Sequence, residues 1–391
     1  MATATHQPAR PQADYIAAAE ALAPVFAGRA EQHDRDASFA FENFDDLRDA
    51  GLLNLGIPVE EGGDGQGLAV RARVLRTIAA GDPSTALVLA MHYNQHAGLA
   101  RNRRWPDEVY RRVVTDSLDG IALINALRVE PDLGTPARGG LPATTARRTA
   151  DGWSLTGHKI YATGSPILRY YTVWARTDEE TPRVGNFLVP AESPGVRIVE
   201  TWDHLGMRAS GSHDAIFEDV ALPSEFAVDI RLPGEWGGDP IGAVTSALAF
   251  GSVYHGVAVS ARDWIVQFSK DRVPANLGQP LASLPRFQTG IGKIQSLLLV
   301  NERLMDGLAE RTDERGATPD LALEANVVKY VTTNNATDAV HVAMDLAANP
   351  GLSRHSPLER HLRDVMCARV HTPQDDTVLL NLGAAALGVK R

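Results

Sequence analysis

Residues 153–163 read WSLTGHKIYAT, a run in which β-branched and aromatic residues stand between small and polar ones. Such a composition favours a β-strand. Similar short runs, separated by Gly, Pro and Asp, continue on both sides from about residue 118 to residue 226. Several short strands with this spacing predict a small antiparallel barrel or sandwich in the middle of the chain.

The segments on both sides of this β region have a helical pattern. From Ala13 to about Ser117 the apolar residues recur at spacings of three and four, and the loop GIPVEEGGDGQG (residues 56–67) interrupts them. DPST at residues 82–85 supplies capping residues for a further helix. After GEWGGDP (residues 234–240) long amphipathic segments return, the last of them around residues 358–369, and they predict a bundle of four helices.

This order predicts a mostly α protein with a small β domain. We expect an N-terminal helical domain over residues 1–117, a central β domain over residues 118–232 and a C-terminal four-helix bundle over residues 233–391.

The bulk composition narrows the possible partners and location. With 38 Lys and Arg against 48 Asp and Glu, the formal net charge is −10, which disfavours nucleic acid and anionic membrane as partners. Cys367 is the only cysteine, so the chain forms no internal disulfide and no cysteine-based metal site. The first residues, MATATHQPARPQADY, lack the apolar core of a signal peptide, and apolar runs such as ALVLAM from Ala86 are short. These features indicate a cytoplasmic protein.

Five motifs occur in a fixed order along the chain: GIPVEEGGDG, GHKIYATGS (residues 157–165), HLGMRASGSHDAIFEDVALP (204–223), DRVPANLGQPLASLPRFQ (271–288) and PLERHLRD (357–364). Each motif is weak by itself. Together they resemble the acyl-CoA dehydrogenase superfamily of flavoproteins over essentially the whole chain. The resemblance implies the acyl-CoA dehydrogenase fold, with a central β-barrel between the two helical domains.

The resemblance also implies a flavin site. Thr163 matches the family's threonine that faces flavin N5, and Tyr161 stands where a tryptophan lies against the flavin ring. Arg272 matches the arginine that reaches a pyrophosphate across a subunit interface, where its planar fork suits paired oxygens, and Gln288 lies on the following helix. A bound FAD or FMN and a homotetramer, or at least a homodimer, are therefore expected.

The chain departs from the family where a dehydrogenase holds its base. Removal of a thioester α-proton needs a carboxylate, which many members carry in a Tyr-Glu pair after the Arg-Asp of the last motif. Here His371 and Thr372 occupy that pair, and the alternative location at the start of the first bundle helix, residues 241–261, has no acidic residue. Asp375 and Asp376 are the acidic residues left as candidates for a displaced base.

These departures are similar to a different branch, the two-component flavin monooxygenases of the same fold, which include dibenzothiophene monooxygenase, aromatic and indole hydroxylases and amino-sugar nitrososynthases. That branch has a histidine where His371 falls, an asparagine at Asn125 and a serine at Ser165. It often uses a histidine from an N-terminal helix, and MHYNQH offers His92 and His96. These two histidines lie four residues apart without a third ligand, so we expect no metal.

The chemistry of that branch explains these residue types. Its enzymes take reduced flavin from a partner reductase, add O2 at flavin C4a and transfer the distal oxygen of the hydroperoxide to a small aromatic or N- or S-containing substrate. The peroxide must be kept dry and hydrogen-bonded, which suits neutral donors such as Asn125 and Ser165. His92 is expected to line the substrate pocket. A histidine titrates near neutral pH and can move a substrate proton, which is the role predicted for His371.

Three alternatives stay open at this point. The chain is predicted to be a reduced-flavin monooxygenase, but an acyl-CoA dehydrogenase that uses FAD and a displaced base at Asp375 or Asp376 fits the same motifs. A non-catalytic member that only binds flavin is the third. Locally, His371 also reads as an ordinary residue at the C-terminal end of a helix, ahead of Pro373.

Overall fold

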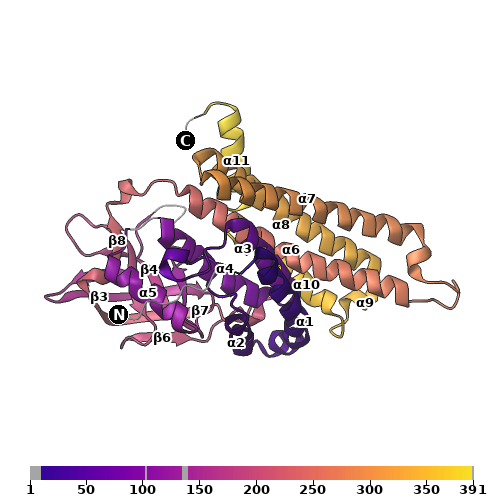
Figure 1. Ribbon diagram of the computed structural model, residues 1–391, viewed down its shortest axis with the longest axis horizontal. Helices are drawn as coiled ribbons and strands as arrows, with labels where there is room; N and C mark the ends of the chain where they lie inside the picture. The colour runs from indigo at the N-terminus through magenta and orange to yellow at the C-terminus, as the bar shows by residue number, and fades with distance from the viewer. Residues whose placement is uncertain (1–9, 102–103, 134–139, 390–391) are drawn as a thin grey trace.

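The chain folds in the predicted order, with N-terminal helices, a central sheet and a C-terminal bundle that extends to one side (Figure 1). The structure is a computed structural model that describes residues 10–101, 104–133 and 140–389. The predicted fold class is confirmed. The strands lie between Leu123 and Arg231, and the boundaries at residues 117 and 232 stay predictions.

The N-terminal part consists of short helices packed on the sheet and on the bundle. The predicted capping residue Asp82 accepts hydrogen bonds from the backbone amides that begin the fourth helix, at 3.0 Å from Ser84 and 3.3 Å from Thr85. Gly81 lets two helices approach closely, since a Cβ there would lie 2.2 Å from the Ala23 carbonyl oxygen. The helices are α1 (Gln12–Asp36), α2 (Phe41–Asp49), α3 (Leu68–Gly81), α4 (Pro83–Arg101) and α5 (Asp107–Asp119), with a 3-10 turn at Val59–Glu61.

The central sheet has eight strands in the order β6-β7-β3-β2-β4-β5-β8, with β1 paired to β4. Most pairs are antiparallel, as expected, but β1 and β2 each pair with β4 in parallel. In the described part of the chain β6 and β8 stay unpaired to each other, so the ladder is an open path rather than a closed ring. The strands are β1 (Leu123–Leu127), β2 (Thr145–Arg148), β3 (Gly152–Ala162), β4 (Leu168–Thr177), β5 (Val184–Pro190), β6 (Val196–Val199), β7 (His213–Pro223) and β8 (Ala227–Arg231).

The C-terminal bundle contains three long helices and one short one. All four begin with a proline in the first turn, where its missing N–H has no helical partner to lose. The last of the four is only ten residues long, and a further helix projects beyond the bundle near the C-terminus (Figure 1). The elements are α6 (Pro240–Asp271), α7 (Pro285–Arg315), α8 (Pro319–Ala347), α9 (Asn349–Leu352), α10 (Pro357–Met366), the 3-10 turn η7 (Cys367–Val370) and α11 (Asp375–Ala386).

Helix α6 is the core of the bundle. Among the described residues it is the one helix long and apolar enough to cross a membrane, yet 83% of its most apolar window is buried inside the protein. The expectation that the apolar runs are too short to span a bilayer is therefore corrected for α6, which is long enough but is buried as a core helix. Gly256 places α6 directly on α3, since a Cβ there would lie 2.5 Å from the Ala79 Cβ.

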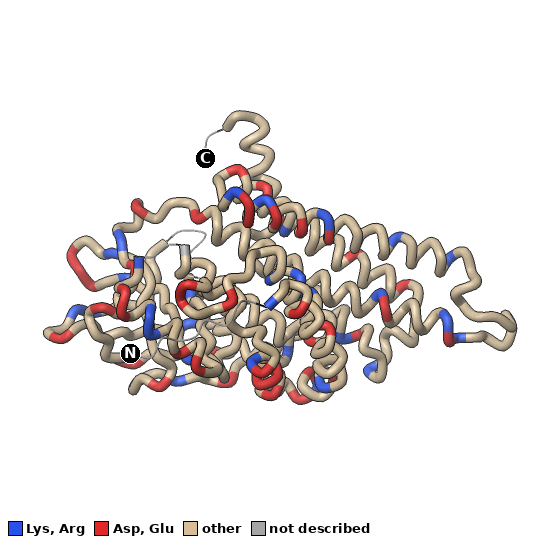
Figure 2. The backbone as a smooth tube through the Cα atoms, viewed as in Figure 1, with Lys and Arg blue, Asp and Glu red and all other residues tan. Residues whose placement is uncertain are grey.

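One cluster of charged residues joins all three parts of the chain. Arg363 of α10 forms paired hydrogen bonds with Asp34 of α1 at 2.6 and 2.9 Å and with Glu359 at 2.8 Å. The next residue, Asp364, accepts the backbone N–H of Met207, between β6 and β7, at 2.7 Å. Elsewhere the charges of both signs are interspersed over the whole chain (Figure 2).

We predict that Arg363→Met lowers the free energy of unfolding by about 3 kcal/mol or more, because it leaves two poorly exposed carboxylates without their partner. Urea denaturation followed by circular dichroism measures the loss. Arg35→Met is the matched control: its ion pair with Glu31 is 61% and 65% exposed, so we expect a loss below about 1 kcal/mol. Equal losses for the two variants would contradict the role of Arg363.

Candidate functional site

A network of hydroxyl groups surrounds the end of β3. The Thr163 hydroxyl lies 2.9 Å from the Ser212 hydroxyl, which lies 2.8 Å from that of Ser210. The Ser165 hydroxyl donates to the Gly211 carbonyl at 2.9 Å. The turn after β3 is thereby fastened to the segment that leads into β7, and the predicted Thr163 and Ser165 lie in one polar patch.

Asn125 and His92 approach the same patch from β1 and α4. The Asn125 amide nitrogen donates to the Thr163 carbonyl at 3.0 Å. His92 Nδ1 accepts the backbone N–H of Ile124 at 3.2 Å, so the proton of this ring lies on Nε2. Burial and the neighbouring His96 ring, 4.5 Å away, hold the pKa of His92 well below its ordinary value. His92 Nε2 is a buried donor to which the described residues offer no acceptor.

Tyr161 belongs to an exposed aromatic cluster beside this patch. Its backbone has a φ of 60° and its side chain is 51% exposed. Trp202 and His204 stack on each other at 3.6 Å, and both present their edges to the Tyr161 ring. Exposed aromatic rings next to several hydroxyls suit a planar heterocycle with polar edges, so the residues fit a flavin ring.

His371 lies after η7 and packs against α6. Its ring stacks on Phe250 at 4.0 Å, and its Nε2 is 2.6 Å from the hydroxyl of Tyr254. Burial raises the pKa of Tyr254 well above its ordinary value, so the phenol keeps its proton. Burial, together with the charge of Lys329, lowers the pKa of His371 to about 3. His371 is therefore a neutral imidazole, in contrast to the titration near neutral pH expected from the sequence.

Lys329 and Asp375 lie on the other side of this histidine. Lys329 is 1% exposed, and its Nζ lies 3.5 Å from Asp375 Oδ1. Burial lowers the pKa of Lys329, and Asp375 opposes that shift. Asn334 donates to the second Asp375 oxygen at 2.8 Å. Of the two candidates for a displaced base, Asp375 is thus held by Lys329 and Asn334, and Asp376 is exposed.

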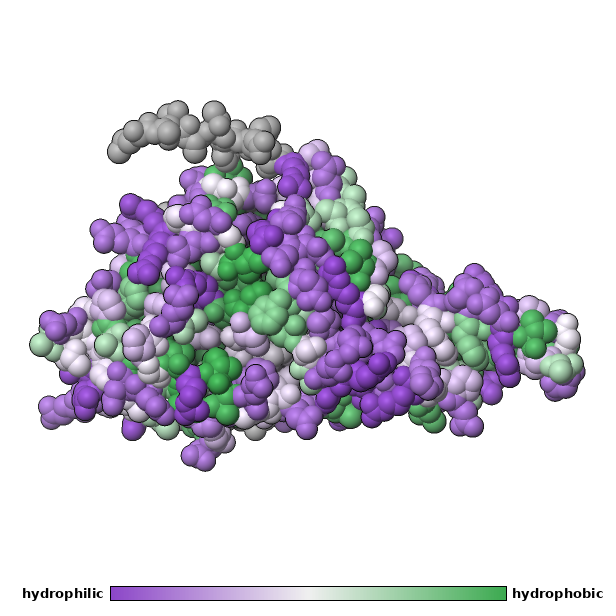
Figure 3. Space-filling model, turned by 90° about the horizontal axis from the view of Figure 1, so that it is seen from below, coloured by the Kyte–Doolittle hydropathy of each residue, from purple (hydrophilic) through white to green (hydrophobic). Residues whose placement is uncertain are grey.

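Arg272 and Gln288 lie at the opposite end of the molecule. Arg272 is exposed at the end of α6, and the Gln288 side chain donates to the Ala282 carbonyl at 3.1 Å near the start of α7. This end of the bundle projects as a narrow arm from the wider body that contains the sheet (Figures 1 and 3). A single chain therefore does not bring Arg272 and Gln288 to Thr163.

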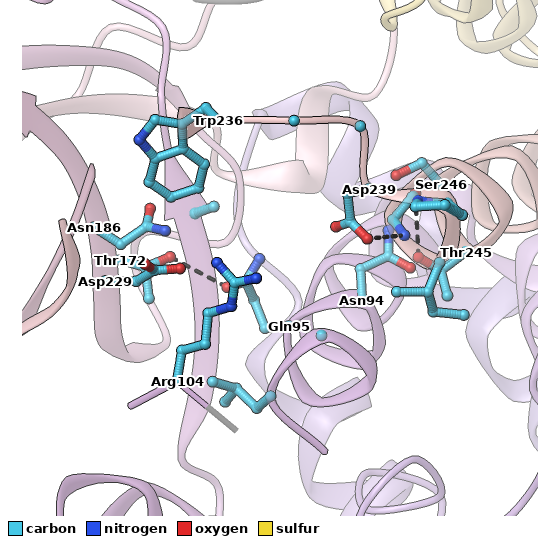
Figure 4. Close-up of a pocket in the computed structure, with 18 of the residues that line it drawn as sticks. Asn94, Gln95, Arg104, Thr172, Asn186, Asp229, Trp236, Asp239, Thr245 and Ser246 are labelled. Atoms are coloured by element: carbon cyan, nitrogen blue, oxygen red, sulfur yellow. Dashed lines mark hydrogen bonds between the residues drawn. The ribbon is translucent and has the colours of Figure 1, made fainter. Parts of the chain in front are cut away.

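A cavity of about 800 Å³ lies between α4, the sheet and the start of α6. Its wall includes Ala126 and Thr172, and the Thr172 hydroxyl lies 3.2 Å from the Gln95 side-chain oxygen and 3.4 Å from the Asn125 carbonyl oxygen (Figure 4). Along β1, Ala126 lines the cavity, and the residue before it, Asn125, contacts Thr163 in the hydroxyl patch. Because the cavity lies so close to this patch, it is the candidate place for a substrate.

Sequence reasoning missed Tyr254, Lys329 and the cavity residues. The lysine inside the apolar run NVVKYV could have indicated a functional position, because a lysine is rarely buried without a partner for its charge. Tyr254 gave no such signal, since tyrosine is common in core helices. No group of three His, Cys, Asp or Glu in the described part of the chain is arranged to hold a metal ion.

Three family models match the chain in sequence order. They are the acyl-CoA dehydrogenase N-terminal domain over residues 5–102, the middle domain over residues 128–220 and the C-terminal domain over residues 248–375. The chain belongs to the acyl-CoA dehydrogenase family. The family resemblance drawn from the five motifs is confirmed.

The relatives of this chain include both a provisionally assigned acyl-CoA dehydrogenase and amino sugar nitrososynthases. YdbM of Bacillus subtilis (strain 168), a provisionally assigned acyl-CoA dehydrogenase, is 33% identical over 93% of this chain and 94% of its own length. The amino sugar nitrososynthase RubN8 of Streptomyces rubradiris is 28% identical over 94% of this chain and 88% of its own length. The solved structure of KijD3 with FMN and a dTDP-amino-keto sugar superposes with a TM-score of 0.86 at 28% identity and covers 99% of this chain and 96% of KijD3. The predicted flavin is borne out in this relative, which contains FMN.

We predict that the His371 ring stays neutral between about pH 5 and 8, because burial and Lys329 disfavour its charge. Nitrogen-15 chemical shifts of labelled histidine rings, assigned with His371→Asn, measure its protonation. Lys329→Met should raise the His371 pKa, because the variant removes a neighbouring positive charge.

Between pH 6.5 and about 3, His371 is protonated in the unfolded chain but not in the native protein. Its contribution to the free energy of unfolding therefore decreases as the pH falls through this range. A titration midpoint near the ordinary value would contradict the prediction.

Proposed function

We propose that this family member is a reduced-flavin-dependent monooxygenase acting on a small aromatic or N- or S-containing substrate. The observation that carries the proposal is the neutral His371, in contact with Phe250 and Tyr254, in the His371–Thr372 pair that replaces the Tyr-Glu pair of a dehydrogenase of this family. The overall reaction takes substrate, O2 and the two electrons and two protons of a reduced flavin, and yields oxygenated product, water and oxidised flavin.

The flavin, either FMN or FAD, would be held at the end of β3. Tyr161 offers its exposed ring, and Thr163 and Ser165 offer hydroxyl and backbone groups of the polar patch. Arg272 and Gln288 would contribute to the flavin of a neighbouring subunit, since they lie at the far end of their own chain. When bound in its reduced form, the flavin supplies the electrons that activate O2.

The protein's own groups then offer hydrogen bonds to the bound ligand. Asn125 uses one amide hydrogen on the Thr163 carbonyl and keeps a second one for a ligand. His92 Nε2–H is an unpaired buried donor, and Ser165 keeps acceptor capacity on its hydroxyl. His371, whose Nε2 is engaged by Tyr254, leaves its Nδ1 for a hydrogen bond to a ligand, while its pKa of about 3 disfavours uptake of a substrate proton.

A second function is favoured by one observation, the 33% identity with YdbM. An acyl-CoA dehydrogenase needs a carboxylate base, and the candidate Asp375 is hydrogen-bonded to Asn334 and lies beside the buried Lys329. This alternative therefore requires Asp375 to leave those partners, or Asp376 to turn inward from solvent. A family member that binds flavin without catalysis is the remaining alternative.

The partners follow from the same proposal. A separate flavin reductase would supply the reduced cofactor in the cytoplasm, and neither nucleic acid nor membrane is proposed as a partner of this mixed-charge surface (Figure 2). A homotetramer or homodimer is favoured by α11, which carries acidic residues only in its first turn. Its apolar side chains project outward, with Leu379 48% and Leu380 49% exposed. Such an exposed apolar helix is typical of a surface that another subunit covers.

Oxygen chemistry gives a direct test of the proposed function. We expect that anaerobic butyryl-CoA leaves the oxidised flavin of the reconstituted protein unbleached. When the protein with reduced FMN is mixed with O2, oxidised-flavin absorbance should return only after a delay, because a dry, hydrogen-bonded site retains the oxygenated state. Stopped-flow absorbance with an oxygen electrode measures both events.

The residue arm of this experiment uses His371→Ala, which should still bind FMN but shorten the delay about tenfold or more. His341→Ala, which removes an exposed histidine from α8, is the matched control and should leave the delay unchanged. Full bleaching by butyryl-CoA would establish the dehydrogenase alternative. Neither bleaching nor a delay would leave flavin binding without catalysis.

We also predict that Leu379→Asp with Leu380→Asp shifts the protein to a smaller assembly, because two charges on α11 oppose its burial against another subunit. Light scattering after size-exclusion chromatography measures the molar mass. Leu352→Asp, at a residue of α9 that is 65% exposed, is the control and should leave the mass unchanged. An unchanged mass in the α11 variant would show that this helix does not form the interface.

A further inference from the structure

Two arginines line the cavity without a direct ion pair to any described residue. The guanidinium of Arg128 lies 4.7 Å from the centre of the Trp174 ring, and it has no ion pair with any residue in the described ranges. Arg104 lines the same cavity and likewise has no hydrogen bond or ion pair within the described part of the chain. Both side chains are exposed to the cavity.

The acidic residues of the cavity are already engaged by other groups. Asp229 accepts a hydrogen bond from Arg231 at 2.7 Å. Glu235 accepts the backbone N–H of Leu232 at 3.1 Å, and Asp239 caps α6 by accepting the N–H of Gly242 at 3.1 Å. None of these three carboxylates forms an ion pair with Arg128 or Arg104 in the described part of the chain, although the charge of Asp239 acts on Arg128. The two guanidinium groups therefore keep their N–H donors for a ligand.

The remaining walls complete a site for an oxyanion. Trp174 and Trp236 meet edge to face at 4.6 Å and form an apolar side. The Arg104 side chain points into the cavity toward Gln95 and Thr172, with Asp239, Thr245 and Ser246 on the opposite wall (Figure 4). A guanidinium presents its N–H donors in a planar fork that matches the paired oxygens of a carboxylate or a phosphate.

We propose that this cavity binds the oxyanionic group of the substrate, a carboxylate or a phosphate, through Arg128 and Arg104. An anion held there directs the rest of the ligand along the wall formed by Ala126 and Thr172, toward the patch that contains Asn125. This proposal rests on the proposed function only in taking the cavity as the substrate site. Uncharged aromatic compounds are accordingly poor ligands of this protein.

The test uses small probes that fit any such cavity and needs neither flavin nor O2. The full-length protein is labelled with 5-fluorotryptophan, and the signals of Trp174 and Trp236 are assigned by single Phe substitutions among the six tryptophans. Sodium acetate, its uncharged isostere acetamide and inorganic phosphate are each titrated through the millimolar range at constant ionic strength. We expect saturable fluorine shifts at Trp174 with acetate or phosphate and none with acetamide. A larger response to phosphate than to acetate identifies a phosphorylated substrate, and the reverse order identifies a carboxylate.

Arg128→Gln and Arg104→Gln should each weaken the binding of the responding anion about tenfold, the loss expected when one charge-assisted hydrogen bond is removed. The matched control is Arg148→Gln. Arg148 also lies 4.7 Å from a tryptophan ring, that of Trp153, but outside the cavity, so its variant should bind the anion like the unmodified protein. Equal responses to acetate and acetamide, no saturable shift with any anion, or unchanged binding in both cavity variants would overturn the proposal. Since no probe undergoes chemistry, failure of the monooxygenase assignment would leave this result intact.

Discussion

The ion pairs of Arg363 with Asp34 and Glu359, together with the hydrogen bond from the Met207 amide to Asp364, hold the N-terminal helices, the sheet and the bundle in one arrangement. A poorly exposed charge is costly unless its partner has good hydrogen-bond geometry, so the contacts of Arg363 and Asp364 favour a single arrangement of the three parts. The position of η7 and His371 follows from it. Because α10 is held on both sides, the chain that leaves it runs against α6 and places His371 on Phe250 and Tyr254.

Burial then decides the charge of the groups around this junction. His371 and His92 are neutral because their sites are poorly solvated, and Tyr254 keeps its proton for the same reason. Lys329 adds a positive charge beside His371 and holds Asp375 at the start of α11. A site of neutral donors and acceptors is suited to oxygen transfer, whereas abstraction of a thioester α-proton requires a free carboxylate. The relatives divide between these two chemistries, and the local electrostatics of this chain are the basis on which oxygen transfer is proposed.

Much of the fold was predictable because it depends on local pattern. Helical and β segments were placed in the correct order, Asp82 was recognised as part of a cap, and the missing carboxylate was found by counting from Asp364. The sheet was harder, since parallel pairing of β1 and β2 with β4 depends on long-range contacts that no local pattern contains. Lys329, Tyr254 and Arg128 were missed because each is an ordinary residue in its own segment and gains its meaning only from neighbours in space.

The sequence by itself determined the family, the order of the three parts and the replacement of the Tyr-Glu pair by His371 and Thr372, because these are properties of residue type and spacing. Only the tertiary structure decided that His371 is neutral, that Asp375 is held by Lys329 and Asn334, and that Arg128 and Arg104 share one cavity without a direct ion pair in the described part of the chain. The physical reason is that burial and electrostatic interaction are sums over neighbours, and in this fold those neighbours come from helices and strands far apart in the chain.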